Sequence, residues 1–192
     1  MEFNSNQCVI AFFDDCFLFF AWMKKQDTAQ KIEELKKKLD LLPHPEGGFY
    51  KETYRSEGHI EEPYFGAEKR SFSTGIYFLL VSGNFSAFHR IKQDEMWHFY
   101  DGDSINLHIL TQNGEYQLVK IGRDFKNGEV PQYVVNAGDW FASEVSVKEG
   151  YSLAGCTVSP GFDFADFEMA ERKELLQGYP KYSDVIRKLT RD

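Results

Sequence analysis

The chain has 192 residues, a formal net charge of −8 at pH 7 and an apolar content of 42%. This length suits one domain of ordinary size that buries a sizeable core. The acidic balance argues against a nucleic-acid surface, which needs clustered Lys and Arg side chains. The aromatic share of 16%, carried mostly by 18 Phe and 10 Tyr, predicts a β-rich core or a cavity lined by rings.

Residues 1–22 differ in composition from the rest of the chain. Two apolar runs, at residues 9–13 and 16–22, are interrupted by two aspartates. The stretch is too short and too broken to span a bilayer, and it lacks the basic region and cleavage site of a signal peptide. We interpret it as a non-native or disordered extension without function. The alternative is an apolar arm that docks on the domain or on a partner subunit. Residues 23–192 are predicted to form one domain.

The chain contains three cysteines, Cys8, Cys16 and Cys156, without a regular spacing. An odd number of cysteines without C-x-x-C pairs predicts neither a disulfide framework nor a cysteine metal site. A reducing compartment, and therefore a cytoplasmic location, is the expectation. Cys156 lies in an apolar strand, where a buried structural thiol is expected.

Apolar residues recur at helical spacing over residues 28–42, and two prolines follow this segment. The pattern predicts an amphipathic helix, capped at Asp27 or Thr28, that the prolines end. The apolar positions are Ile32, Leu35, Leu39 and Leu42.

Short runs with strand character come next, and turn signals rich in Gly, Asn and Asp separate most of them. Short strands at roughly 8–12-residue spacing predict an antiparallel sandwich or barrel rather than βαβ units. The barrel is expected over about residues 45–165, followed by short helices over residues 167–177 and 182–189. The nine strand-like runs are residues 48–54, 71–81, 85–91, 96–100, 104–111, 116–121, 132–135, 140–143 and 151–158.

His89 and Glu95 precede an aromatic strand that ends in Asp101 and Gly102. Side chains alternate along a strand, so Glu95, Trp97 and Phe99 share one face while His98 faces away. Such a pair in the mouth of a barrel can hold a metal, move a proton or bind a polar ligand. The pattern does not fix the face of His108.

Several motifs of the chain resemble those of the cupins. The spacing Gly83-x5-His89-x-Ile91-x3-Glu95-x6-Gly102 resembles the first cupin motif, and residues 136–141 resemble the second. The segments at residues 44–50, 86–89, 94–98 and 159–164 look like those of the small single-domain cupin_5 family, over about residues 39–180.

This resemblance implies an all-β fold, a double-stranded β-helix or jelly roll, here with an N-terminal helix and short C-terminal helices. It also implies a homodimer and a shape related to the dTDP-4-dehydrorhamnose type of sugar-nucleotide epimerase. The biochemical activity of the family is largely unassigned, so the resemblance predicts a fold and not a reaction.

The chain departs from a metal-binding cupin at two ligand positions. Metal cupins offer three histidines and a glutamate, whereas this chain keeps His89 and Glu95 and has Ile91 and Phe141 at the other two places. Two protein ligands rarely hold a transition metal, so no metal cofactor is expected. A divalent metal, if present, is expected on His89 and Glu95.

His89 and Glu95 are the predicted catalytic residues. A glutamate inside a barrel requires a partner, and pairing with His89 would raise the pKa of the imidazole and lower that of the carboxyl. His89 would then act as a general base oriented by Glu95. The expected ligand-binding residues are Glu46, Arg55, Tyr77, Trp97 and Phe99.

Two of these ligand-binding residues flank the first strand-like run, Glu46 just before it and Arg55 at its end. Paired glycines after Glu46 permit a tight turn or a close backbone approach to a ligand, and Arg55 is a candidate anion clamp.

Three functions remain open at this point. The first is a metal-independent epimerase or isomerase of a small polar, carbohydrate-like molecule, with His89 as base. The second is a noncatalytic small-ligand binding protein that acts as a sensor or carrier. The third is a divalent-metal enzyme. The expected partners are a small-molecule ligand and a second copy of the chain, with no nucleic acid and no membrane.

Overall fold

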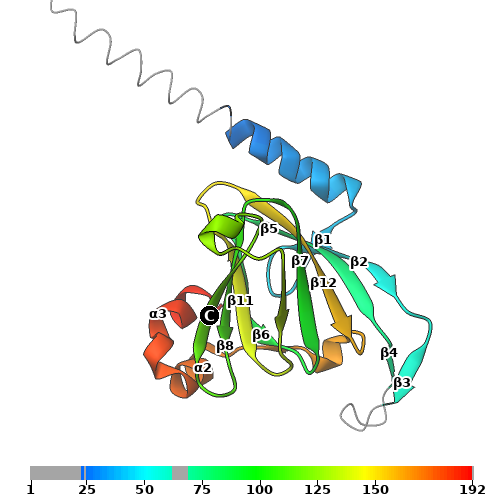
Figure 1. Ribbon diagram of the computed structural model, residues 1–192, viewed down its shortest axis with the longest axis vertical. Helices are drawn as coiled ribbons and strands as arrows, with labels where there is room; N and C mark the ends of the chain where they lie inside the picture. Colours follow the sequence, from blue (N-terminus) through cyan, green and yellow to red (C-terminus); the bar gives the residue numbers. More distant parts are fainter. Residues whose placement is uncertain (1–22, 24, 62–68, 192) are drawn as a thin grey trace, which may run out of the picture.

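The computed structural model describes residues 23, 25–61 and 69–191, so the interpretation of residues 1–22 lies outside the described residues. Two antiparallel sheets form the body of the protein (Figure 1). The six-stranded sheet has, in spatial order, β1 (Leu42–Pro43), β2 (Phe49–Arg55), β5 (Thr74–Val81), β12 (Tyr151–Ser159), β7 (Asp94–Gly102) and β10 (Gln132–Val135).

The second sheet has five strands and faces the first. Its order is β13 (Glu168–Met169), β6 (Phe85–Arg90), β11 (Trp140–Val145), β8 (Ile105–Leu110) and β9 (Tyr116–Ile121). A separate hairpin pairs β3 (His59–Glu61) with β4 (Lys69–Ser71). The predicted all-β jelly roll is confirmed by this two-sheet arrangement.

The main core lies between the two sheets. Side chains along a strand point alternately to the two faces of the sheet, so every second one points inward. Phe78 and Trp97 of the first sheet therefore meet Leu107 and Phe141 of the second. All four side chains are at most 2% exposed. The aromatic content of the sequence therefore serves mainly to fill the space between the sheets.

The N-terminal helix, blue in Figure 1, packs through Ile32 and Leu35 on the outer side of the six-stranded sheet, and Leu39, just after the helix, packs beside them. The helix spans residues 25–38 and is shorter at its C-terminal end than predicted. Asp40 has a positive φ of 53°, and Leu42 pairs with β2 as part of β1. Leu42 is therefore 57% exposed and does not belong to the buried face of the helix.

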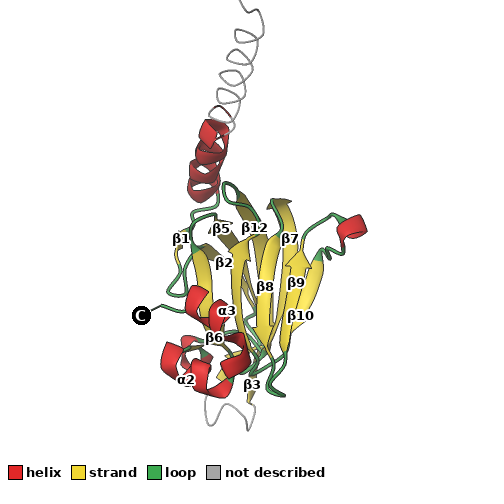
Figure 2. Cartoon of the chain, turned by 90° about the vertical axis from the view of Figure 1, so that its left-hand side faces the viewer, coloured by secondary structure: helices red, strands yellow, loops and turns green. Residues whose placement is uncertain are grey.

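Two short helices, α2 (Arg172–Gly178) and α3 (Ser183–Lys188), cover the outer face of the five-stranded sheet (Figure 2). Leu175 and Ile186 pack there against Phe88 and Leu110. The helix predicted over residues 167–177 begins only at Arg172, because β13 first pairs with β6. No helix within residues 25–61 or 69–191 is long and apolar enough to cross a membrane.

The segment after β12 closes one end of the barrel, and we call residues 160–167 the closing loop. It contains a 3-10 turn, η3 (Phe164–Asp166), whose Asp166 carboxylate is buried. The Arg70 guanidinium bonds both oxygens of Asp166, at 2.8 and 3.1 Å, and Gln93 donates a third bond. These contacts attach the loop to β4 and to the turn before β7.

Candidate functional site

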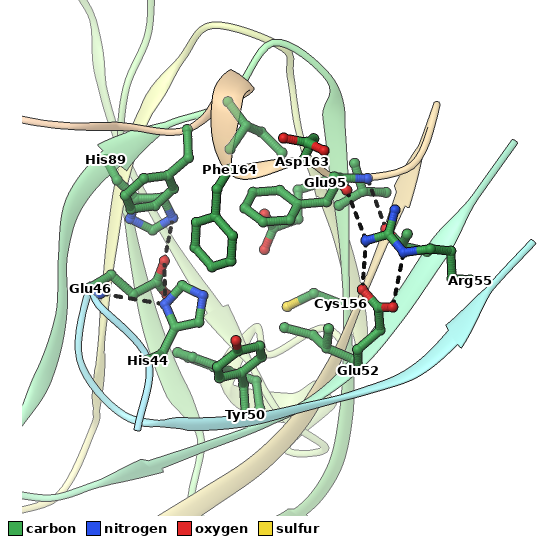
Figure 3. A pocket seen from close by; sticks show the side chains of 17 residues that line it. His44, Glu46, Tyr50, Glu52, Arg55, His89, Glu95, Cys156, Asp163 and Phe164 are labelled. Atoms are coloured by element: carbon green, nitrogen blue, oxygen red, sulfur yellow. Dashed lines mark hydrogen bonds and ion pairs between the residues drawn. The ribbon is translucent and has the colours of Figure 1, made fainter. Parts of the chain in front are cut away.

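A cavity of about 390 Å³ lies at the end of the barrel that the closing loop covers (Figure 3). Its polar lining comes from the turn before β2, from β2 itself, from β5, β6, β7 and β12, and from the closing loop. Its apolar wall is largely aromatic. The polar residues are His44, Glu46, Glu52, Arg55, Thr74, His89, Glu95, Cys156 and Asp163, and the rings are those of Tyr50, Phe78, Phe162, Phe164 and Phe167.

Glu46 and His89 form a buried pair on one side of the cavity. The Nε2 atom of His89 lies 3.0 Å from Glu46 Oε2, and both side chains are at most 7% exposed. Ser86 donates a hydrogen bond of 2.8 Å to the other carboxyl oxygen of Glu46. The Nδ1 atom of His89 lies 2.7 Å from the carbonyl oxygen of Ala87. The site therefore fixes His89 through both ring nitrogens.

These contacts determine where the protons lie. A carbonyl oxygen only accepts, so Nδ1 of His89 carries a hydrogen, and the contact between Nε2 and Glu46 then needs one further proton. Burial raises the pKa of Glu46 well above its usual range, and the nearby Glu95 raises it further. Burial lowers the pKa of His89 to about 3. At neutral pH the protonated Glu46 therefore donates to a neutral His89.

His44 stands on the other side of Glu46 and was not among the predicted site residues. Its Nδ1 lies 3.4 Å from the Glu46 carboxyl and accepts a bond of 3.4 Å from the Glu46 backbone N–H. Burial lowers the pKa of His44 to about 4. The neutral ring consequently carries its hydrogen on Nε2, which points into the cavity (Figure 3). A sequence signal existed in the segment of residues 44–48, where His44 stands two residues before Glu46.

Glu95 lies on the opposite side of the cavity from the Glu46–His89 pair (Figure 3). Burial raises its pKa to about 7, while the thiol of Cys156 beside it has a lesser, opposing effect. Burial and the same carboxyl raise the pKa of Cys156 well above its usual range, so this thiol stays protonated. Cys156 is buried as predicted, but its side chain also lines the cavity.

The predicted pairing of His89 with Glu95 is not what the structure contains. Within the described residues no hydrogen bond or ion pair joins the two, and the carboxyl that bonds His89 is Glu46. The sequence could not predict this partner, because Glu46 belongs to a turn outside the strands and strand alternation says nothing about it.

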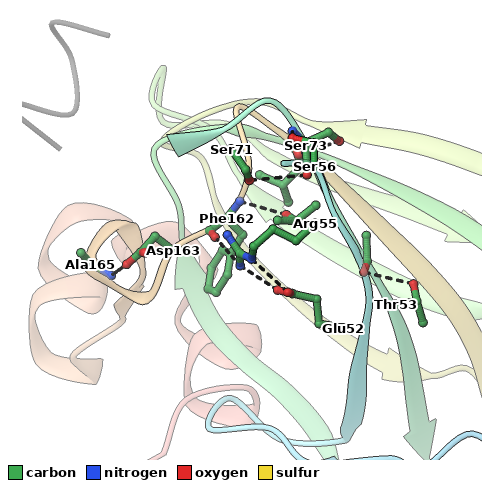
Figure 4. A network of polar contacts seen from close by, with 12 residues as sticks. Glu52, Thr53, Arg55, Ser56, Ser71, Ser73, Phe162, Asp163 and Ala165 are labelled. Carbon is green, nitrogen blue, oxygen red and sulfur yellow. Dashed lines mark hydrogen bonds and ion pairs between the residues drawn. The ribbon is translucent and has the colours of Figure 1, made fainter. Parts of the chain in front are cut away.

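Arg55 lies at the rim of the cavity and is already paired (Figure 4). Its guanidinium binds both oxygens of Glu52, at 2.9 and 2.7 Å, and donates a third bond to the carbonyl oxygen of Phe162. Arg55 therefore links β2 to the closing loop. Its charge is largely balanced within the protein.

The other predicted ligand-binding residues lie outside the cavity lining. Trp97 and Phe99 face inward, as strand alternation predicts, but they belong to the core between the sheets. Tyr77 lies on the outer side of the six-stranded sheet, with its ring 6.1 Å from that of Tyr100. Only Glu46 and Arg55 of that group line the cavity.

The remaining barrel histidines also lie away from the cavity. His98 faces outward and bonds Thr157 at 3.0 Å and Gln132 at 2.9 Å. His108 is buried near the C-terminal helices, with Nδ1 at 2.8 Å from the hydroxyl of Tyr116. Neither contributes to the site.

The sequence profile of the Cupin_5 family, described as "Cupin superfamily (DUF985)", matches residues 33–170. The chain belongs to the Cupin_5 family. A protein of Saccharomyces cerevisiae, "Uncharacterized protein YML079W", is 29% identical over 170 residues, which are 82% of this chain and 84% of the yeast protein. These matches identify the family without assigning an activity.

Solved structures of similar proteins support the same conclusion. A hypothetical protein from Leishmania major is 35% identical, with a TM-score of 0.78 over 83% of this chain and 98% of that one. A protein from Shewanella oneidensis is 41% identical, with a TM-score of 0.76 over 83% and 96% of the two chains. Oxalate decarboxylase from Bacillus subtilis, at 14% identity and a TM-score of 0.50 over 77% of this chain and 36% of that one, shares the fold.

The cupin superfamily includes metal-binding proteins, but the residues of this site do not fit a metal as arranged. Across the described residues no group of three His, Cys, Asp or Glu side chains is placed to hold an ion. Both ring nitrogens of His89 are engaged, and the ring of Phe141 lies 4.1 Å from that of His89. Ile91 adds an apolar side chain to the cavity wall. The absence of a metal cofactor stays a prediction.

Proposed function

We propose that this Cupin_5 protein binds a small polar, carbohydrate-like carbonyl compound in the cavity and moves a proton on it, as a metal-independent epimerase or isomerase. The observation that carries the proposal is the placement of two carboxyl groups with raised pKa values, Glu46 and Glu95, on opposite sides of one cavity. Raised carboxyl pKa values in a cavity are typical of acid–base catalysts.

The two carboxyls suit complementary roles. With a pKa of about 7, Glu95 is partly ionised at neutral pH and can remove a proton from the carbon next to a carbonyl. The C–H bond breaks, its electron pair passes into an enolate, and the proton goes to Glu95. Glu46 holds a proton at the same pH, in its hydrogen bond to His89, and gives it to the enolate from the other side when that bond breaks. A stereocentre inverts when the proton returns to the opposite face.

His89 supports this chemistry as the partner of Glu46. Its Nε2 faces the Glu46 carboxyl at 3.0 Å, and the Ala87 carbonyl keeps the imidazole in the tautomer that accepts there. The proposal therefore changes the predicted role of His89 from the base itself to the residue that orients the acid.

The cavity also suits a ligand with hydroxyl groups. Its volume of about 390 Å³ is within the usual range of small-molecule sites, and it combines aromatic walls with a few polar groups. The Nε2–H group of His44 adds a hydrogen-bond donor that points into the cavity.

The proposal is tested by hydrogen exchange. Ketoses and aldoses are incubated with the protein in D₂O, and proton NMR follows the loss of the signal from the hydrogen next to the carbonyl. We expect exchange with the wild-type protein and a loss of at least about a hundredfold in the Glu95→Gln and Glu46→Gln variants. His59→Ala, a change on the separate β3–β4 hairpin, should leave the exchange rate unaltered.

A noncatalytic small-ligand carrier is the second candidate, and one observation favours it. Glu46 is already satisfied by Ser86 and His89, as a structural buried carboxyl would be. Sugars that shift the NMR signals of His44 and Glu95 without any hydrogen exchange would support the carrier and contradict the enzyme.

A further inference from the structure

We infer that the ligand of this cavity carries a protonated amine in addition to its hydroxyl groups. The inference deepens the proposed function and rests on its claim that a small polar ligand binds in the cavity. It is carried by the distribution of charge around the cavity, by the surroundings of Glu95, and by the aromatic rings of the closing loop.

The charged groups that line the cavity are mostly acidic. Four carboxyl residues contribute, of which Glu46 is protonated, and the only Lys or Arg among the lining residues that the structure describes is Arg55. Arg55 is bound by both oxygens of Glu52 and by the Phe162 carbonyl. His44 and His89 are neutral because burial lowers their pKa values to about 4 and about 3. A carboxylate or phosphate ligand would therefore find no cation that is not already paired.

Glu95 is the carboxyl that an ammonium group would meet. Its side chain lines the cavity, and Cys156 is the one described side chain found to interact with it as a hydrogen-bond partner. A thiol is a weak donor and does not balance a charge. Carboxylates are almost never enclosed without a partner, so a cation from outside the protein would stabilise the ionised form of Glu95.

The aromatic wall favours the same ligand. Phe162, Phe164 and Phe167 all line the cavity, with ring centroids 5.0 to 6.4 Å apart. The faces of such rings attract an ammonium group within about 6 Å and have no comparable attraction for an anion. A cavity that combines a carboxylate with several rings therefore selects a cation over a neutral or acidic ligand.

Binding of an amine has a predictable pH dependence. The pKa of Glu95 is raised by burial to about 7, so below that pH the carboxyl must lose its proton before it can pair with an ammonium group. Affinity should fall about tenfold for each pH unit below about 7 and level off above it. The same pairing keeps Glu95 in the ionised form that the proposed function needs.

The test uses three six-carbon polyols that differ in one terminal group. Glucamine carries an ammonium group, sorbitol a hydroxyl group and gluconate a carboxylate. Titration calorimetry measures the affinity of each, and NMR shifts of the His44 ring report whether binding occurs in the cavity. We expect glucamine to bind at least about tenfold more tightly than sorbitol, and gluconate to bind most weakly.

Two variants with a matched control complete the test. Glu95→Gln should abolish the preference for glucamine and its pH dependence, whereas Glu95→Asp, which keeps the charge, should retain both. The control Glu115→Gln removes an exposed carboxyl outside the cavity and should behave as wild type. Equal binding of glucamine and sorbitol in the cavity would overturn the inference and leave the proposed function intact. Tightest binding of gluconate would also overturn it. Failure of all three to bind would also overturn the inference, whereas the proposed function is decided separately by the hydrogen exchange of ketoses and aldoses.

Discussion

The imidazole of His89 lies between the Ala87 carbonyl, which accepts a hydrogen bond from it, and the Glu46 carboxyl, which donates one to it. NMR can observe this arrangement directly. Burial lowers the pKa of His89 to about 3, and the contact with the Ala87 carbonyl places its hydrogen on Nδ1. Nitrogen-15 NMR should therefore show a single neutral tautomer from neutral pH down to about pH 4, with free histidine as the internal reference. A doubly protonated ring above about pH 5 would contradict the protonated state assigned to Glu46.

A second residue-scale prediction concerns the stability contributed by Glu95. The folded pKa is about 7 and the ordinary value is 4.5, so between these values the folded state binds more protons than the unfolded state. Stability therefore falls as pH rises through this window, by an amount on the order of 3 kcal/mol.

The Glu95→Gln variant should lack this contribution. Urea unfolding at several pH values measures the difference in free energy of unfolding between wild type and variant, which should shift in favour of the variant as pH rises. Glu115→Gln serves again as the control because its side chain is exposed. A difference that stays constant from about pH 4.5 to about pH 7 would show that Glu95 titrates normally.

At the residue scale, the sequence predicted what strand alternation governs. Glu95 and Trp97 share an inward face, and His98 faces outward, because neighbouring strand residues point to opposite sides. The sequence did not predict that His89 pairs with Glu46, or that Trp97 is covered by core residues instead of lining the cavity. Both facts depend on how a turn and a second sheet pack in three dimensions.

The turn that carries Glu46 is an element with little tolerance for change. Gly47 has φ of +117°, and a Cβ atom there would lie 2.1 Å from the carbonyl oxygen of Phe85. Gly47→Ala should therefore cost at least about 3 kcal/mol in free energy of unfolding, through both backbone strain and the clash.

Gly114→Ala is the matched control for that substitution. Gly114 has φ of +81°, but no other atom lies within 4 Å of the position that an alanine Cβ would occupy, so only the backbone cost of about 1–2 kcal/mol applies. Chemical denaturation of both variants measures the difference. Equal costs would show that the turn can move away from β6.

The closing loop depends on one buried ion pair. Burial alone would raise the pKa of Asp166, but hydrogen bonds from Arg70, Gln93 and Lys92 lower it. Asp166→Ala removes the hydrogen bonds that Arg70 and Gln93 donate to the buried carboxylate and should cost about 3–5 kcal/mol. Glu168→Ala breaks the exposed pair with Arg90 and should cost less than about 1 kcal/mol. Thermal unfolding monitored by circular dichroism compares the two, and similar losses would contradict the anchoring role.

Elements were predicted to different extents. The nine longer strands were recognised because turn residues separate short β-forming runs, and most lie within a few residues of their observed positions. The short strands β1, β3, β4 and β13 were not predicted as strands of their own. Helix ends were less accurate. Leu42 fits the helical spacing by chance, and the helix predicted over residues 167–177 starts late because residues 168–169 pair with β6. The spacing of apolar residues along the sequence does not reveal that a distant strand will pair with the backbone of these residues.

For the molecule as a whole, the homodimer implied by the family resemblance stays a prediction. The outer side of the six-stranded sheet exposes two tyrosines, Tyr54 at 57% and Tyr100 at 46%, which suit an interface. Sedimentation equilibrium should give a dimer at micromolar concentrations, and Tyr100→Glu should weaken it. Leu118→Glu, at a residue on β9 that is 49% exposed, is the control. A wild-type monomer would contradict the prediction.

The turn that carries Glu46 is also held by a residue from the far end of the sequence. Arg191 donates to the carbonyl oxygen of Glu46 at 3.1 Å, across a separation of 145 residues, and to that of Phe85 at 3.0 Å. A ribosome that adds about 5–20 residues per second needs on the order of ten seconds to make the intervening chain. During that time the turn exists without Arg191, so the final geometry of the site is acquired only after residue 191 has been synthesised.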